Sequence, residues 1–379
     1  KKVLEKLDIF ARAGNFRALD FRFREIAVLN GRLEIDFADR IHYPAIAGIV
    51  IEGPNFSKKI NCGGGALGDY EADWPATPRS AETLDFYLDW ASHEFGPEAA
   101  ESIASIFAKI DGHLPQPNVW TGPGGLKPDP RTWEEARADY QFVDALAKLE
   151  PLVQGPGNRE RFAYWLASLS YMREMTHLEC LWAEYNAAAE ILKTKPDEEA
   201  KATFAEETLL PIRERMVAVL KDLYGYLLAT VSNTGELGTV ANWEQHLLPA
   251  LIDRPAEELR KALGHEIPSE AQVPKIYGGR PRVIVPTVRT VLAAGEALRL
   301  KVIILAQEQP SEAAFYWREM GQGEYAAIPL QNIARGVCKV TCPETEKELE
   351  YYVRVRSGSE EVYFPATAPA VSQTVVRKR

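Results

Sequence analysis

The 379-residue sequence predicts an α+β multidomain protein: a partial β-sandwich, an all-α helical domain and a C-terminal immunoglobulin- or fibronectin-like β-sandwich. Three observations support this prediction. Residues 1–60 mix β-branched and aromatic residues with polar alternates, which is typical of strands. Within residues 80–265 the apolar residues recur at helical spacing. From residue 281 the apolar spacing changes to two, the period of a strand with one buried face.

Residues 1–60 are predicted to be strands of an incomplete domain. Asn30-Gly31 stands between two strand-like segments, and both residues tolerate the positive φ angles of a tight hairpin turn. The stretch PAIAGIVIEG then predicts a buried strand. So few strands do not bury an independent core. We therefore expect the sheet to be completed by a missing N-terminal segment, by another chain or by packing on the helical domain.

Residues 61–79 are predicted to connect this region to the helices. The stretch GGGALGD resembles a phosphate-binding loop only loosely, because it lacks the Gly-Lys-Ser/Thr ending of such loops. A run of glycines is also typical of a simple turn, which is the alternative interpretation.

Residues 80–265 are predicted to form helices with recognisable ends. Gly96-Pro97 separates the first two helices, because proline is favoured in the first helical turn. Thr132 and Glu135 have the spacing of a capping box. Pro211 predicts a kink inside a later helix. Further predicted features are caps at Ser80 and Asn158, a helix start at Pro196, a turn over 232–238, a helix end at Gly264, and an apolar stripe of Phe162, Trp165, Leu166, Leu169 and Met172.

Residues 266–280 contain several prolines and glycines, which predict a linker. Beyond the linker, about seven short segments alternate apolar and polar residues, with turn residues between them. This pattern is typical of an immunoglobulin- or fibronectin-like sandwich, which we assign to residues 281–379.

Charge and composition exclude some classes of partner. The formal net charge is −10, whereas nucleic acids and anionic membranes attract basic surfaces. No apolar run is long enough to predict a membrane-spanning helix. The four cysteines have neither the spacing of a disulfide framework nor that of a zinc site, so no metal or other cofactor is expected. The first residue is Lys, which predicts a processed chain or part of a longer one, and a secreted or periplasmic location is favoured.

Three parts of the chain together resemble regions of large bacterial multidomain glycoside hydrolase-like proteins. Residues 1–37, followed by PAIAGIVIEG, resemble the C-terminal half of a malectin-like carbohydrate-binding domain. The stretch DFYLDWASHEFGPEAAESIASIF resembles the start of the helical domains that follow the catalytic barrel in such proteins. The segments GEYAAIPL, GVCKVTCP and EYYVRVRSGSEEVYFPATAPAVSQTVV are similar to their C-terminal β-sandwiches.

The resemblance implies that this chain is the C-terminal, accessory portion of a carbohydrate-active enzyme. Its partner would be an oligo- or polysaccharide. No part of the sequence predicts a complete (β/α)8 barrel, and the resemblance places the catalytic carboxylates in that barrel. It therefore assigns no catalytic residue to this chain.

The stretch PNVWTGPGGLKPDPRTW, residues 117–133, is a stiff loop between predicted helices. Sugar recognition needs an aromatic ring against the C–H face of a pyranose and planar polar groups for its hydroxyls. Trp120, Asp129 and Arg131 supply these groups, and Trp133 ends the stretch. The alternative is a loop that crosses helix ends with Trp120 as a hydrophobic plug.

A second cluster of similar chemistry lies in GELGTVANWEQH, where Trp243 and Glu244 are candidate sugar contacts. Glu244 and His246 are two residues apart, so on a helix their side chains diverge and do not bind one metal ion.

Glycoside cleavage needs two carboxyl groups at a fixed separation. Four acidic residues in or near predicted loops are candidates: Asp69, Asp129, Glu236 and Glu244. A solvated or capping carboxylate is the alternative for each of them.

Two other functions stay open at the level of sequence. The chain is a structural or assembly subunit that acts through protein–protein contacts, or its helical domain is a complete glycan-cleaving enzyme. An exposed apolar surface along residues 1–60, paired to another chain, would favour the assembly role. A concave groove that holds Trp120 or Trp243 together with carboxylates would favour glycan binding.

Overall fold

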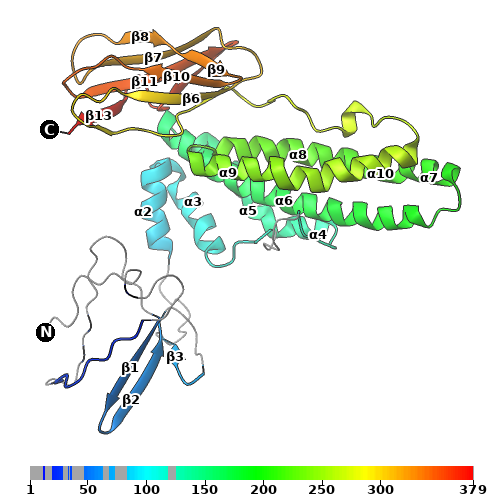
Figure 1. Ribbon diagram of the computed structural model, residues 1–379, viewed down its shortest axis with the longest axis horizontal. Coiled ribbons are helices and arrows are strands. Elements are labelled where there is room, and N and C mark those ends of the chain that lie inside the picture. The colour runs from blue at the N-terminus through cyan, green and yellow to red at the C-terminus, as the bar shows by residue number, and fades with distance from the viewer. Residues whose placement is uncertain are drawn as a thin grey trace. The chain divides into compact units, whose positions relative to one another are not determined.

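The computed structural model combines a helical region with several antiparallel sheets (Figure 1). It describes residues 12, 19–28, 33, 35, 47–62, 68–72, 83–117 and 125–378. The chain divides into two compact units, Lys1–Glu82 and Thr83–Arg379, and each is described by itself.

The first unit contains a small sheet. Strands β1 (Gly48–Gly53) and β2 (Phe56–Asn61) form an antiparallel hairpin in which Gly53 pairs with Phe56. Strand β3 (Glu71–Ala72) pairs with β2 in parallel, so part of the predicted connector belongs to the sheet.

Two strand predictions for the first unit need correction. Residues 19–28 are not in a strand, and β1 is half exposed rather than buried. Strand β1 stays half exposed because a short sheet buries a face only when a second layer covers it. Asn30-Gly31 and Ser80 lie outside the described residues.

The second unit begins with helices, and the prediction that helices dominate residues 80–265 is confirmed. No strand occurs within residues 125–265, all of which the structure describes. The helices are α2 (Leu84–Phe95), α3 (Pro97–Ile110), α4 (Trp133–Arg137), α5 (Gln141–Ala147), α6 (Pro156–Lys193), α7 (Glu198–Phe204), α8 (Leu210–Thr230), α9 (Thr234–Asn242) and α10 (Arg254–Leu263).

Several helix boundaries follow the local signals in the sequence. Gly96 adopts a positive φ of 95° between α2 and α3, and Pro97 begins α3. Thr132 and Glu135 form both hydrogen bonds of the capping box. Gly264 ends α10 in the left-handed conformation with φ 77°. Each of these signals acts within one helical turn, so the local sequence alone predicts where the helix begins or ends.

Other boundaries differ from the prediction. Helix α6 begins at Pro156 with Gly155 at the cap position. Asn158 therefore lies inside the first turn, where its side chain accepts a hydrogen bond from Arg161 instead of capping. Asp197, not Pro196, caps α7 by accepting from the backbone N–H of Ala200.

Three prolines are accommodated by wide π-helical turns. The turns η3 (Ala205–Leu209), η4 (Trp243–Leu247) and η5 (Pro249–Asp253) each end two residues before a proline: Pro211, Pro249 and Pro255. A proline has no N–H for the carbonyl four residues earlier, and its ring needs space there. The wider turn provides that space, so the helix continues through the proline.

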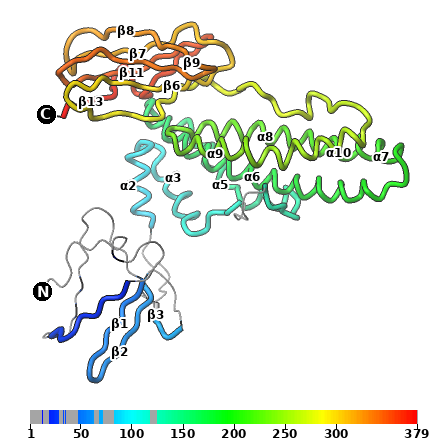
Figure 2. Tube along the Cα trace, in the orientation of Figure 1, coloured from blue at the N-terminus to red at the C-terminus, as the bar shows by residue number. Residues whose placement is uncertain are grey.

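Two apolar cores hold the helices together. One joins α2, α3 and α5 to the first half of α6, and it includes the predicted stripe from Phe162 to Met172. The other joins the second half of α6 to α7, α8 and α10. Ile267 and Ala271, in the predicted linker, pack into this second core. The linker is therefore partly docked, although it runs from α10 to the sheets without a long helix or strand (Figure 2).

Two sheets follow the linker. The four-stranded sheet has the order β4-β6-β10-β9, with β4 (Arg282–Ile284), β6 (Arg299–Leu305), β9 (Gln331–Ala334) and β10 (Val337–Thr341). The six-stranded sheet has the order β5-β13-β11-β7-β8, and β12 also pairs with β11. Its strands are β5 (Val291–Leu292), β7 (Glu312–Glu319), β8 (Ala326–Pro329), β11 (Leu349–Ser357), β12 (Glu360–Phe364) and β13 (Gln373–Arg377).

One apolar core is shared by these two sheets. Val302 and Val340 contribute from the four-stranded sheet, and Phe315, Tyr351 and Val353 from the six-stranded sheet. More strands form than the seven predicted. Pro286 lies between β4 and β5 and separates them, because proline removes a donor from the ladder.

No helix among the described residues combines the length and the apolar character needed to cross a membrane.

Candidate functional site

The end of the proline-rich loop forms an ordered cluster of charges at the start of α4. Arg131 directs its Nε and Nη2 toward the carboxylate of Asp129, with Nη2 donating to Oδ2 at 2.7 Å. Nη1 of the same guanidinium donates to Asp139 at 2.9 Å. The backbone N–H of Asp129 donates to the carbonyl of Glu179 on α6, which ties the loop to that helix. Arg131 is thus held in one orientation while its side chain stays partly exposed.

The pKa values of this cluster follow from its contacts. The side-chain hydrogen bond from Arg131 lowers the pKa of Asp129, although partial burial opposes the shift. Hydrogen bonds to Asp129 and Asp139 raise the pKa of Arg131. The guanidinium of Arg131 therefore stays ionised. It offers a planar fork of N–H donors with a fixed geometry.

A stacked pair of rings lies beside this fork. Trp133, two residues after Arg131, stacks on His177 of α6 with ring centroids 4.1 Å apart and planes 10° from parallel. His177 Nδ1 lies 3.3 Å from Glu174, and Arg173 donates to the same carboxylate at 2.9 Å. Trp133 is half-buried. The stack on His177 covers part of the indole, and the rest of the indole stays accessible.

Several polar groups on α6 or in contact with it are buried. Tyr140 and Thr176 share a hydrogen bond of 2.8 Å, and both are buried. Glu174 and Glu179 are buried carboxylates on the same helix. Burial tends to raise the pKa of Glu174, but the hydrogen bond with His177 and the charge of Arg173 outweigh it, so the pKa is lowered.

The surface formed by Arg131, Trp133 and His177 is called the α4 site below. An aromatic ring and a fixed planar fork are the two groups that sugar recognition requires. Trp120, the predicted aromatic contact of the loop, lies outside the described residues, so its role stays a prediction. Sequence reasoning did not find the contribution of His177. The spacing of Glu174 and His177 places both on one face of a helix, but no local signal shows that Trp133 meets His177.

The second predicted cluster has a different character. Trp243 is fully buried in the helical core, and its Nε1 donates to Tyr171 at 2.8 Å. No face of this ring is accessible, so Trp243 acts as a core residue and not as a surface contact. Glu244 is exposed and accepts a hydrogen bond from Tyr224 at 3.0 Å.

The other candidate carboxylates also have structural partners. Glu236 accepts from the backbone N–H groups of Ser232 and Asn233 and completes a capping box at the start of α9. The predicted turn over 232–238 is therefore helical from Thr234. Asp69 pairs with Lys59 in the first unit.

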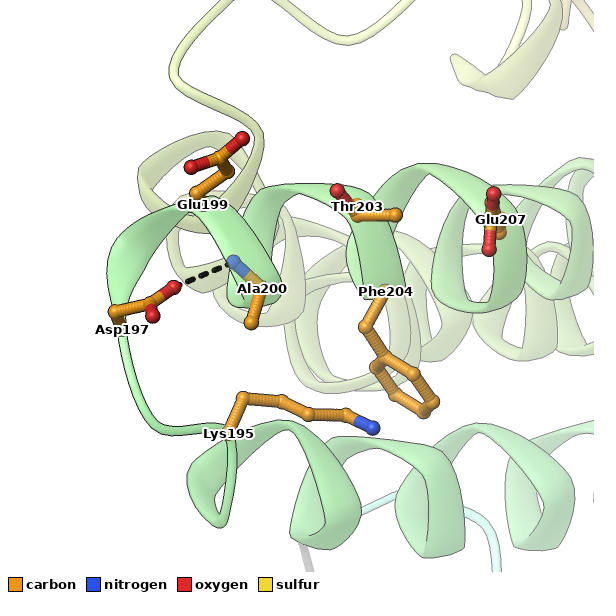
Figure 3. A pocket seen from close by; sticks show the side chains of 7 residues that line it. All are labelled: Lys195, Asp197, Glu199, Ala200, Thr203, Phe204 and Glu207. Carbon is orange, nitrogen blue, oxygen red and sulfur yellow. Dashed lines mark hydrogen bonds between the residues drawn. The ribbon is translucent and has the colours of Figure 1, made fainter.

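An open hollow of about 440 Å³ lies at the turn between α6 and α7 (Figure 3). Lys195 extends over the ring of Phe204, with its ammonium 4.3 Å from the ring centroid. Asp197 is used as the helix cap, and Glu199 and Glu207 line the outer side. The lysine occupies the place that a ligand ring would take, so we assign no binding role to this hollow.

Within the described part of the chain, no group of three or more His, Cys, Asp or Glu side chains is arranged to hold a metal ion. Comparison with known proteins gives no relative from which a role can be transferred: no protein-family model matches the chain, and no curated protein sequence matches it.

Proposed function

We propose that this chain is the accessory portion of a carbohydrate-active enzyme, contributing glycan binding and architecture to a glycoside hydrolase. The observation that carries the proposal is the α4 site. There the half-buried Trp133 is held by His177, and Arg131 is held by two carboxylates next to it. Both groups are ordered before a ligand arrives, so little conformational entropy is lost on binding.

Replacing Trp133 with Ala should weaken oligosaccharide binding by about 1–3 kcal/mol, with base–aromatic stacking as the nearest measured scale. Isothermal titration of the purified chain against a panel of oligosaccharides measures this change. The matched control is Trp182→Ala. Trp182 lies on α6, is half-buried like Trp133, and stacks on Tyr185. If both substitutions weaken binding equally, Trp133 has no specific role in oligosaccharide binding.

The architecture supports the proposed assignment of the C-terminal sheets to an immunoglobulin-like sandwich. In that fold one sheet has the strand order A-B-E-D, and the other contains C, F and G. The order β4-β6-β10-β9 corresponds to the first sheet, and β7, β11 and β12 to the second. The malectin-like character of residues 1–60 is proposed from the resemblance alone.

A structural or assembly role is the second candidate, and one observation favours it. Apolar side chains in the first unit are exposed: Phe23, Ile26, Val28, Val50 and Phe56. Such surfaces are typical of protein–protein contact. Light scattering of the purified chain tests self-assembly: a concentration-dependent oligomer that Val50→Lys and Phe56→Lys abolish would favour this role.

Catalysis is proposed to lie outside this chain. The candidate carboxylates Asp129, Glu236 and Glu244 each have a described structural partner. We expect no turnover of aryl glycosides by the isolated chain. Turnover that disappears in Asp129→Asn or Glu244→Gln would instead make the helical domain the catalyst.

A further inference from the structure

The outer side of the six-stranded sheet carries a row of tyrosines that the α4 site does not involve. Alternate residues of β11 point to opposite sides of the sheet. Tyr351 and Val353 enter the core, so Tyr352 and Arg354 lie on the other side. Four tyrosines gather there, and we call them the tyrosine face: Tyr316, Tyr325, Tyr352 and Tyr363.

Register and stacking hold the tyrosine face in one shape. Tyr316 and Tyr352 are directly opposite each other on β7 and β11, and their rings stack with centroids 4.8 Å apart and planes 3° from parallel. Tyr325 meets Tyr352 edge to face at 4.9 Å. Tyr363 stands at the other end of the row, 6.3 Å from Tyr352 and tilted by 48°. The tilt leaves the ring of Tyr363 unstacked, and this side chain is half-buried.

Charged groups surround the row in neutral pairs. Arg354 pairs with Glu312, Arg318 with Glu350 and Arg356 with Glu361. Two of the carboxylates also accept from the ring hydroxyls, Glu312 from Tyr316 and Glu361 from Tyr363.

Arginines cover two of the rings, Tyr316 and Tyr325. The guanidinium of Arg354 lies 4.9 Å from the ring centroid of Tyr316, and that of Arg318 lies 4.3 Å from Tyr325. Tyr316 is thus covered by Tyr352 and Arg354, and Tyr325 by Arg318 on one face, whereas Tyr363 has only a tilted ring contact among the described ring and cation contacts.

The pairing of charges selects the class of ligand. Each of these guanidinium groups is matched by a carboxylate, so the row has no uncompensated charge that would attract an ionic ligand. A sugar hydroxyl both donates and accepts, so it can add to a paired carboxylate and a paired guanidinium without breaking them. An accessible ring beside such groups suits the C–H face of a pyranose.

We propose that the tyrosine face is a second carbohydrate-binding surface, independent of the α4 site, which takes neutral glycans with Tyr363 as its stacking ring. The fixed ladder of rings and ion pairs positions Tyr363 and presents hydrogen-bonding groups on one side of it.

Isothermal titration of the full chain against neutral polysaccharides (galactomannan, xyloglucan, arabinoxylan) and against polygalacturonate tests this. The Trp133→Ala background isolates the tyrosine face. We expect a neutral glycan to bind with an affinity that does not change between low and high NaCl, because no ion is exchanged. Tyr363→Ala should weaken binding about tenfold or more, on the scale of aromatic stacking, whereas Tyr363→Phe should retain most of it.

The matched control is Tyr164→Ala, which removes an exposed tyrosine from α6. The melting temperature of each variant shows whether the fold is intact. The proposal is overturned if Tyr164→Ala and Tyr363→Ala behave alike, if no neutral glycan binds, or if only polygalacturonate binds and salt abolishes the interaction. If Tyr363→Ala has no specific effect but Trp133→Ala weakens oligosaccharide binding as expected, only the tyrosine face is contradicted and the α4 site is still supported. The two proposals are therefore tested separately.

Discussion

At the scale of single residues, the same side chain has opposite roles in two parts of the helical region. Trp133 lies half-buried at the start of α4, and Trp243 is fully buried between helices. Both are flanked by polar residues in the sequence, so composition alone does not separate them. The difference arises because Tyr171 and Tyr224, from other helices, enclose Trp243.

Trp243→Ala should therefore lower the free energy of unfolding by about 3–5 kcal/mol, through lost contacts and an unfilled cavity. Tyr171→Phe should cost about 1–3 kcal/mol, because the buried indole N–H loses its acceptor. Urea denaturation measures both. If Trp243→Ala keeps its stability but loses glycan binding, Trp243 is a sugar contact and not a core residue.

The carboxylate of Glu174 should make the chain sensitive to acid. Its pKa lies below the usual value of 4.5, since the contacts with His177 and Arg173 outweigh burial. A lowered pKa stabilises the fold above the unfolded-state pKa, and this contribution is lost as the pH falls through the folded-state value. Below about pH 4.5 the wild type should therefore lose stability more steeply than Glu174→Gln.

Unfolding free energies across an acid series check this expectation. Glu184→Gln is the control, because Glu184 is on the same helix but forms an exposed pair with Arg215. Exposed pairs contribute little, so parallel acid curves for Glu174→Gln and wild type would contradict the assignment.

At the scale of elements, glycine has two distinct uses in these helices. Gly225 lies inside α8, where an added Cβ meets open space and the backbone is ordinary. Gly264 ends α10 with φ 77°, a conformation that side chains disfavour.

Gly225→Ala should raise the free energy of unfolding by about 0.5–1 kcal/mol, because alanine loses less entropy in a helix. Gly264→Ala should lower it by about 1–2 kcal/mol through the left-handed backbone. Thermal and urea denaturation of the two variants side by side measure the opposite signs. If both substitutions change the free energy of unfolding in the same direction, α10 does not end at Gly264 as described.

At the scale of the second unit, Arg282 joins the sheets to the helices. It lies on β4 and donates to the carbonyls of Leu228 and Val231 at the end of α8. Leu228 O also accepts from the backbone N–H of Val231, the C-cap residue, and a cation at this end of α8 complements the helix dipole. Burial lowers the pKa of Arg282 without preventing this contact.

Arg282→Met should lower the free energy of unfolding by about 1.5–3 kcal/mol, the range for hydrogen bonds to charged groups. It should also separate the unfolding of helices from that of sheets, since a shared contact is lost. Far-ultraviolet circular dichroism follows the helices, and amide hydrogen exchange of the strands follows the sheets. Coincident transitions in Arg282→Met would show that other contacts couple them, and Arg282→Lys is the conservative control.

The sequence by itself determined the order of helical and strand regions and many helix ends. Gly96-Pro97, the Thr132–Glu135 capping box and Gly264 act through atoms within one or two turns, so they are readable without a structure. Alternation beyond residue 281 likewise indicated strands with one buried face.

Only the tertiary structure decided burial and the meeting of distant residues. Whether a strand such as β1 is covered depends on a second layer, and whether Trp243 is exposed depends on which helices surround it. His177 reaches Trp133 because α4 packs on α6, and Tyr316 reaches Tyr352 because of the register of two strands. Pairing and packing join residues far apart in the chain, and a local pattern carries no information about which partners meet.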